Sequence, residues 1–280
     1  MSLRNRWLRA VSAIAIGSLV GLDAQTHDFW LQPSVFHAMP GQPVELRILI
    51  GDPGAVEHWE TEWRKVVSLQ DFAPTAVRDL LAALRPLNGA APELTRVDAA
   101  VTLAGEGTHI VAFTSNQQFS ELPAGQFTSY ALHEGLALPL AGRKANGKTK
   151  AAGRELYSRR AKALVQIGAQ ATATVSQPIG QTLEIVPERN PYLLKPGEPL
   201  RVVVWFHGAP LPGASVVLES LDVGATHGTP ALTDSRGSAS WPLPSKGDWK
   251  INVVWSYPID APRADYETIF CSLTFGTQAL

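Results

Sequence analysis

Cysteine is almost absent from this chain, and that scarcity excludes whole classes of protein. Cys271 is the only cysteine, so no disulfide can form within the chain and no Cys-x-x-Cys redox or metal motif exists. It lies in an apolar run, residues 269–273, which favours a buried core position over a reactive thiol.

Motifs of the common catalytic centres are missing as well. There is no Gly-x-Ser-x-Gly turn, no His-Glu-x-x-His helix and no glycine-rich phosphate loop. The histidines are scattered, without the short spacings of a metal-ligand pair. We therefore expect that the chain is not an enzyme.

Positive charge is not in excess either. The formal net charge is −1, and the densest group of Lys and Arg, residues 143–150, falls in a small, polar segment, residues 141–153, that is expected to be an exposed loop. A nucleic-acid surface would need a larger basic patch. No nucleic acid is expected as a partner.

One apolar run stands out, at the amino terminus. Basic residues 4–9 precede apolar residues 10–22, and Ala24 ends a small-residue cleavage site, which is the layout of a secretory signal peptide. A membrane-spanning helix would need about 20 apolar residues. We predict export to the periplasm with residues 1–24 removed, and membrane contact only through that signal peptide. Removal takes away three arginines and Asp23, which leaves a net charge of −3.

Proline and glycine, by contrast, are abundant. The 21 prolines and 23 glycines divide the chain into short segments and exclude long helices. Short apolar or alternating runs between them predict β-strands. These runs are residues 44–50, 66–69, 97–103, 109–113, 163–167, 183–186, 200–206, 214–218, 237–243, 249–255 and 267–275. The predicted fold is all-β, with two β-sandwich domains at residues 25–178 and 179–280.

Residues 119–160 interrupt the first predicted sandwich. The spacing of Leu122, Phe127 and Tyr130 is partly helical. We predict a partly helical excursion that leaves the first sandwich and returns to it. Insertions of this length in a compact domain are usually functional or disordered.

The second predicted domain has short strands with a turn signal between most of them, which is typical of an immunoglobulin-like sandwich. Within it, the loop at residues 208–216 and the turn at residues 233–237 resemble those of carboxypeptidase-regulatory-like (transthyretin-like) sandwiches. This resemblance implies a fold and no activity.

Candidate chemistry concentrates at the predicted mature amino terminus. His27 is third from the new amine, so the amine, two backbone amides and the imidazole can form a square-planar site for Cu(II) or Ni(II). Asp28 adds a carboxylate and Trp30 an aromatic shield. A structural interpretation stays open, in which His27 packs against Trp30 or bonds to Asp28.

Several blocks occur in the order found in a family of exported bacterial proteins. They are His27-Asp28-Phe29-Trp30-Leu31, Glu121-Leu122-Pro123 with Phe127 and Tyr130, Glu134-Gly135-Leu136, Gly153-Arg154-Glu155-Leu156-Tyr157-Ser158-Arg159 with Lys162, and Ser272-Leu273-Thr274-Phe275. The chain resembles domain-of-unknown-function family 4198, whose members are often described as periplasmic components of nickel or cobalt uptake. It departs from the family at Gln32, where Glu is typical, and at Asp52, where His is frequent.

The resemblance implies a periplasmic protein that binds a divalent transition metal (Ni, Co or Cu) and works beside a metal transporter. The ligands it implies are His27, Asp28, Glu155 and Tyr157, supported by Trp30, Tyr130, Glu134, Arg154 and Lys162. Arg154, Glu155 and Lys162 can instead form a buried network that fixes the excursion to the first sandwich. The alternative function is a non-catalytic envelope module that binds carbohydrate through its tryptophans, or binds a partner protein.

Overall fold

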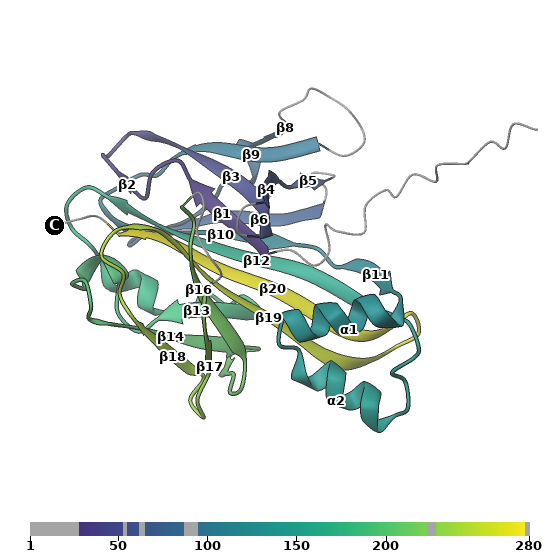
Figure 1. Ribbon diagram of the computed structural model, residues 1–280. Helices are drawn as coiled ribbons and strands as arrows, with labels where there is room; N and C mark the ends of the chain where they lie inside the picture. Colours follow the sequence, from purple (N-terminus) through teal and green to yellow (C-terminus); the bar gives the residue numbers. More distant parts are fainter. Residues whose placement is uncertain (1–27, 53–54, 62–64, 87–94, 223–227, 278–280) are drawn as a thin grey trace, which may run out of the picture.

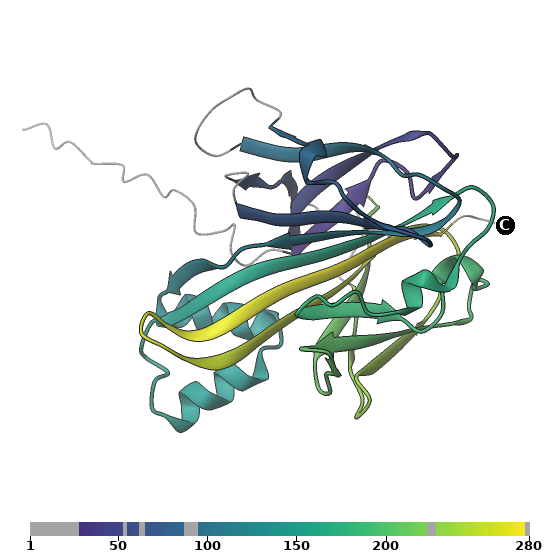
Figure 2. The same ribbon diagram turned by 180° about the vertical axis from the view of Figure 1, so that it is seen from behind.

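Two smaller β-sheets cover opposite faces of a long central sheet, and two helices lie at one end of it (Figures 1 and 2). This computed structural model describes residues 28–52, 55–61, 65–86, 95–222 and 228–277. The all-β class predicted from the sequence is confirmed. Within the described residues, no helix is long and apolar enough to cross a membrane.

The central sheet has ten strands. Its main path, in spatial order, is β17 (Thr229–Leu232), β16 (Ser215–Ser220), β19 (Gly247–Ala261), β20 (Ala264–Thr277), β12 (Gly153–Ile167), β10 (Gly107–Ser115), β6 (Val66–Phe72) and β7 (Val77–Asp79). Two short strands, β2 (His37–Ala38) and β11 (Gln118–Leu122), also pair with β12.

Strands from the two halves of the chain meet in this sheet. β12 and β20 run parallel, in register from Glu155 opposite Tyr266 to Ala163 opposite Thr274. The predicted domain boundary near residue 178 stays a prediction, and the segments on its two sides share both the central sheet and one hydrophobic core.

The first covering sheet packs on one face of the central sheet. It contains β1 (Asp28–Pro33), β3 (Pro43–Asp52), β9 (Thr95–Thr102), β5 (Glu60–Thr61), β4 (Ala55–His58) and β8 (Leu84–Pro86). A short 3-10 helix, Leu81–Ala83, precedes β8. Side chains alternate between the faces of a strand. Accordingly, Ala161, Ala163 and Val165 of β12 point to this side, where they pack with Phe29 and Ile48.

The second covering sheet packs on the opposite face. It contains β13 (Leu183–Pro187), β14 (Pro199–Phe206), β15 (Ala209–Pro210) and β18 (Ser238–Pro242), with 3-10 helices at Ala173–Ser176 and Pro191–Leu193. Its core takes in Ile110, Leu164 and Cys271 from the central sheet. Cys271 is fully buried, as predicted, and burial raises the pKa of its thiol to about 12.

The predicted excursion contains α1 (Ala124–His133) and α2 (Ala137–Ala145), here called the α1–α2 hairpin. Phe127, Tyr130 and Ala131 recur at helical spacing and bury one face of α1 against the central sheet. Gly135 (φ +67°) makes the turn between the helices, a conformation that glycine adopts without strain. The expectation of a loop from residue 141 to 153 is wrong at its start, because α2 continues to Ala145.

Candidate functional site

Two of the predicted site residues of β12, Glu155 and Tyr157, lie on one face of the central sheet, beneath α1. Glu155 and Tyr157 are two positions apart, so their side chains point to the same face. From α1, the Tyr130 ring stacks on that of Phe270, with ring centroids 6.4 Å apart. Burial raises the pKa of Tyr130 well above its usual range, and the nearby charges of Glu155 and Glu134 add to this effect. The structure therefore brings four predicted site residues together, namely Glu155, Tyr157, Tyr130 and Glu134.

Glu155 is almost completely buried, with 1% of its surface exposed. Thr268 donates its hydroxyl to Oε2 of Glu155 at 2.6 Å and lies 2.9 Å from the Ser256 hydroxyl. Burial raises the pKa of Glu155 to about 7, although the Thr268 hydrogen bond and the charge of Arg159 act in the opposite direction. The Thr268 hydroxyl has a single proton, which it donates to Glu155. The hydrogen bond between Ser256 and Thr268 therefore uses the proton of Ser256.

Arg159 completes this cluster and was missed in the sequence analysis. Its guanidinium lies 5.0–5.7 Å from the centroids of the surrounding aromatic rings, which belong to Tyr157, Phe29, Phe270 and Trp59. Burial lowers the pKa of Arg159, whereas its contact with Tyr157 raises it. The signal was present in the sequence, because Glu155, Tyr157 and Arg159 alternate along one strand and must share a face.

Asp28 belongs to a second buried cluster, at the start of β1. Its carboxylate accepts hydrogen bonds from Lys250 Nζ and from Asn252 Nδ2. The Lys250 ammonium also lies 2.9 Å from Glu219 Oε2 and 4.6 Å from the centroid of the Trp30 ring. Burial lowers the pKa of Lys250, but the two carboxylates outweigh this effect and leave it above its usual value. We call Asp28, Glu219, Lys250 and Asn252 the Asp28 cluster.

The residues described do not fit the metal site that the family resemblance implies. Both carboxylate oxygens of Asp28 already accept hydrogen bonds, and Glu155 is next to a buried guanidinium, which repels a metal cation. In the described part of the chain, no three His, Cys, Asp or Glu residues are grouped so that they could hold a metal ion. His27 lies outside the described residues, so its proposed role stays a prediction.

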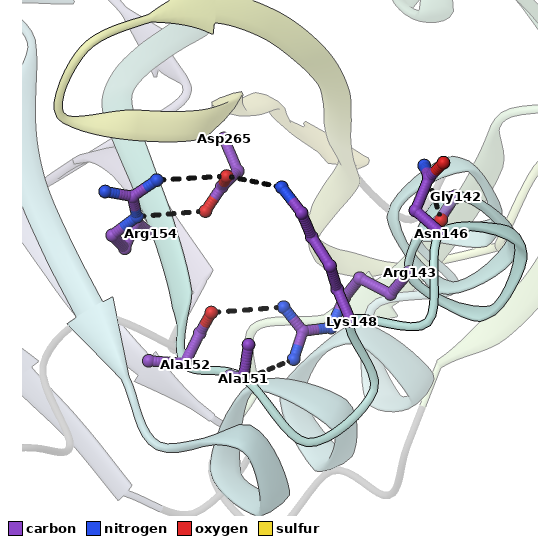
Figure 3. Close-up of polar contacts among 8 residues, drawn as sticks. All are labelled: Gly142, Arg143, Asn146, Lys148, Ala151, Ala152, Arg154 and Asp265. Carbon is purple, nitrogen blue, oxygen red and sulfur yellow. Dashed lines mark hydrogen bonds and ion pairs between the residues drawn. The ribbon is translucent and has the colours of Figure 1, made fainter.

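Arg154 is adjacent to Glu155 in β12, so its side chain lies on the opposite face of the strand, and it joins β12 to Asp265, near the start of β20 (Figure 3). Its guanidinium makes two hydrogen bonds to Asp265, at 3.0 and 3.1 Å, and Lys148 reaches the same carboxylate at 3.5 Å. Arg143 is buried and donates to the carbonyls of Ala151 and Ala152. These contacts fix the end of α2 and the segment after it against β12 and β20.

Lys162 lies on the other face of β12, in a buried ion pair with Glu184 at 2.9 Å. Glu184 also accepts the backbone N–H groups of Ile179 and Gly180, both at 3.0 Å. This pair joins the two halves of the chain. Lys162 therefore fixes the fold and is separate from the residues beneath α1.

Three exposed leucines lie on either side of the contact between the hairpin turn and β16. Leu132 is 65% exposed, Leu138 46% and Leu232 72%. Leu132 and Leu138 flank the turn in which Gly135 lies against the side chain of Ser215, and Ser215 is opposite Leu232 in the sheet. We call these three residues the leucine surface; no sequence motif had singled them out.

A family model matches most of the chain. The model described as "Domain of unknown function (DUF4198)" matches residues 24–257, as the sequence blocks had predicted. No curated protein sequence matches the chain.

Similar solved structures exist, all at low identity. A trypsin-activated alpha-2-macroglobulin from Escherichia coli is similar over 89% of this chain and 15% of its own length, with 11% identity and a TM-score of 0.23. Dimeric latent PorU from Porphyromonas gingivalis is similar over 94% of this chain and 21% of its own length, with 12% identity and a TM-score of 0.20. The mouse nectin-like molecule 4 ectodomain is similar over 87% of this chain and 62% of its own length, with 11% identity and a TM-score of 0.22. The chain thus spans a small part of the first two. TM-scores this low carry no argument about function.

Proposed function

The chain belongs to the DUF4198 family, and we propose that it is an exported, non-catalytic binding protein of the cell envelope that contacts its partner through the leucine surface. The observation that carries the proposal is the exposure of Leu132, Leu138 and Leu232 on both sides of the contact between the hairpin turn and β16. Single exposed leucines are common on protein surfaces. Apolar side chains that gather on one surface usually mark an interaction site.

Export is supported by the position at which the fold begins. The first described strand starts at Asp28, shortly after the predicted cleavage site at Ala24. The side chain of Asp28 is then built into the core through Lys250. A cleavage after Ala24 would therefore leave every strand of the described fold intact.

A non-catalytic role is supported by the burial of the most unusual ionisable residues. Glu155 and Arg159 are at most 3% exposed, and the rings of Tyr130 and Phe270 cover them. A catalytic acid or base has to reach the substrate. Both residues are instead closed off from solvent.

Among envelope partners, carbohydrate has less support than protein or lipid. Sugar-binding sites stack aromatic rings that face solvent. Every tryptophan with a described side chain is buried or partly buried: Trp30, Trp59, Trp205, Trp241, Trp249 and Trp255. The large hydrophobic side chains that are exposed in the described residues are those of Leu, Val and Met.

A transition metal remains a second candidate ligand, with a metal transporter as the partner. Its support is the sequence position of His27, bonded to the anchored residue Asp28 and third from the predicted amine. Asp28, Glu155 and Tyr157 have other partners, so His27 and the amine would have to supply the site.

Cysteine labelling tests whether the leucine surface is covered in the cell. Leu138→Cys and Leu193→Cys place a thiol at two leucines of similar exposure, 46% and 54%, and the native Cys271 is buried. We expect both thiols to react with a maleimide in the purified protein. In native cells, Leu138→Cys should react much more slowly, and Leu193→Cys should not change. Equal reactivity of the two thiols in cells would contradict the proposal.

A further inference from the structure

The α1–α2 hairpin and the segment after it carry a net positive charge, and Glu134, between the two helices, is their one acidic residue. From residue 135 to 154 the chain contains no Asp or Glu, and its cations are Arg143, Lys144, Lys148, Lys150 and Arg154. The full chain has a net charge of −1, so this concentration is local. A protein with this distribution turns its hairpin toward an anionic surface and its remaining, net negative part away from it.

The structure separates the cations that hold the fold from those that face solvent. Arg143 donates to backbone carbonyls, and Arg154 and Lys148 share Asp265 (Figure 3). Lys144 and Lys150 are exposed, and no ion pair is found for either within the described residues. Arg263, also exposed, adds a cation at the adjoining turn between β19 and β20.

The exposed leucines lie on the same hairpin as these lysines. Leu132 ends α1, Leu138 begins α2, and Lys144 lies near the end of α2. The hairpin lies at one end of the central sheet (Figures 1 and 2).

We propose that the α1–α2 hairpin docks on an anionic lipid surface, with Leu132 and Leu138 entering the headgroup layer and Lys144 and Lys150 meeting lipid phosphates. Apolar side chains flanked by lysines are the combination that holds a peripheral protein at a membrane interface. Zwitterionic lipid has no net negative charge that would attract the lysines. The proposal rests on the proposed function, since it names the partner of the leucine surface, and it differs from the sequence-based expectation of membrane contact only through the signal peptide.

Vesicle sedimentation tests the proposal with the mature protein, residues 25–280. The probes are phosphatidylcholine vesicles with and without phosphatidylglycerol. We expect binding only to the anionic vesicles, and release when salt rises to about 1 M, where the screening length falls to roughly 3 Å. No binding to anionic vesicles, or equal binding to both kinds, would overturn the proposal.

Matched variants assign any binding to the hairpin. Lys144→Gln with Lys150→Gln should weaken the partition constant by roughly 10- to 30-fold, at about 1 kcal/mol per lysine near an anionic surface. The control, Lys195→Gln with Lys246→Gln, removes two exposed lysines elsewhere and should have no effect. Leu138→Asp should reduce binding, whereas Leu193→Asp should not. Equal effects of the hairpin and control variants would overturn the proposal.

The labelling and vesicle experiments together distinguish failure of the two proposals. If Leu138→Cys is protected in cells but the protein does not bind anionic vesicles, the partner is an acidic protein; the lipid proposal then fails and the proposed function stands. If neither effect is observed, both fail.

Discussion

The ammonium of Lys250, on β19, is hydrogen-bonded to the carboxylate of Asp28, the first residue of β1. The two residues are 222 positions apart, so this contact joins the two ends of the described fold. Glu219, 2.9 Å from the same ammonium, and Asn252, which donates to Asp28, complete the Asp28 cluster. The start of β1 is thus fixed by residues of β16 and β19.

Replacing Lys250 by Met should destabilise the protein strongly. The change leaves the carboxylates of Asp28 and Glu219 buried without their cation, and breaking a buried ion pair on one side costs about 3–5 kcal/mol. Urea unfolding measures the loss. Lys246→Met, at an exposed position, should change the free energy of unfolding by no more than about 0.5 kcal/mol. Similar small losses in both variants would show that the Asp28 cluster does not hold β1.

Glu155→Gln should stabilise the protein at alkaline pH and have little effect at acid pH. The folded pKa of Glu155 is raised from 4.5 to about 7, so the native state binds the proton more tightly than the unfolded state does. The wild-type stability therefore falls as pH rises from 4.5 to about 7, and the full cost, about 3 kcal/mol, is present above that range. Glutamine cannot ionise and avoids this cost.

Urea midpoints at pH 5 and pH 8 measure this difference. The control is Glu121→Gln, which removes an exposed carboxylate from β11. The difference in urea midpoint between Glu121→Gln and wild type should be the same at pH 5 and pH 8. A Glu155→Gln variant whose advantage is the same at both pH values would mean that Glu155 is already ionised at pH 5.

Gly153→Ala and Gly142→Ala should change stability in opposite directions. A Cβ at residue 153 would lie 2.1 Å from the nearest Phe127 ring atom, so α1 would have to move and the protein should lose about 1–3 kcal/mol. A Cβ at residue 142, within α2, would meet nothing within 4 Å and should add about 0.4–1 kcal/mol. Thermal unfolding of the pair measures both effects. A loss at residue 142 as large as that at residue 153 would contradict the close packing of α1 on β12.

Metal binding, if present, should depend on His27 and not on Glu155. Calorimetric titration of the mature protein with Ni(II) or Cu(II) should lose its signal in His27→Ala, because the imidazole is needed to complete the square-planar site. Glu155→Gln should retain the signal, since Thr268 and Arg159 occupy that carboxylate. The absence of saturable binding in the wild type would remove the metal candidate, and loss of binding in Glu155→Gln would restore that residue as a ligand.

The strands were predictable because their pattern is local. Each run predicted from residue 44 to 275 overlaps an observed strand, since apolar alternation between turn residues needs no information from distant parts of the chain. The helical excursion was predicted for the same reason. The joining of both halves through β12 and β20 was not, because strand order depends on contacts between segments far apart in sequence.

The candidate site, like the fold, was predicted only in part from the sequence. Glu155, Tyr157 and Tyr130 were recognised from their sequence blocks and do lie together beneath α1. The partners of Asp28 were missed, because nothing near Glu219, Lys250 or Asn252 in sequence indicates that β1 packs across them. The leucine surface was missed because an apolar residue on a helix is ordinarily assigned to the core.

The most direct measurement of the hairpin's role is hydrogen–deuterium exchange on the mature protein, alone and with membrane vesicles from its native cells. Such vesicles carry both lipids and envelope proteins, so the result does not depend on which of them is the partner. We predict that the vesicles slow exchange in residues 130–150 and in β17, and leave β13, β14 and β18 unchanged. Protection confined to those three strands, or no protection anywhere, would show that the α1–α2 hairpin is not the binding surface.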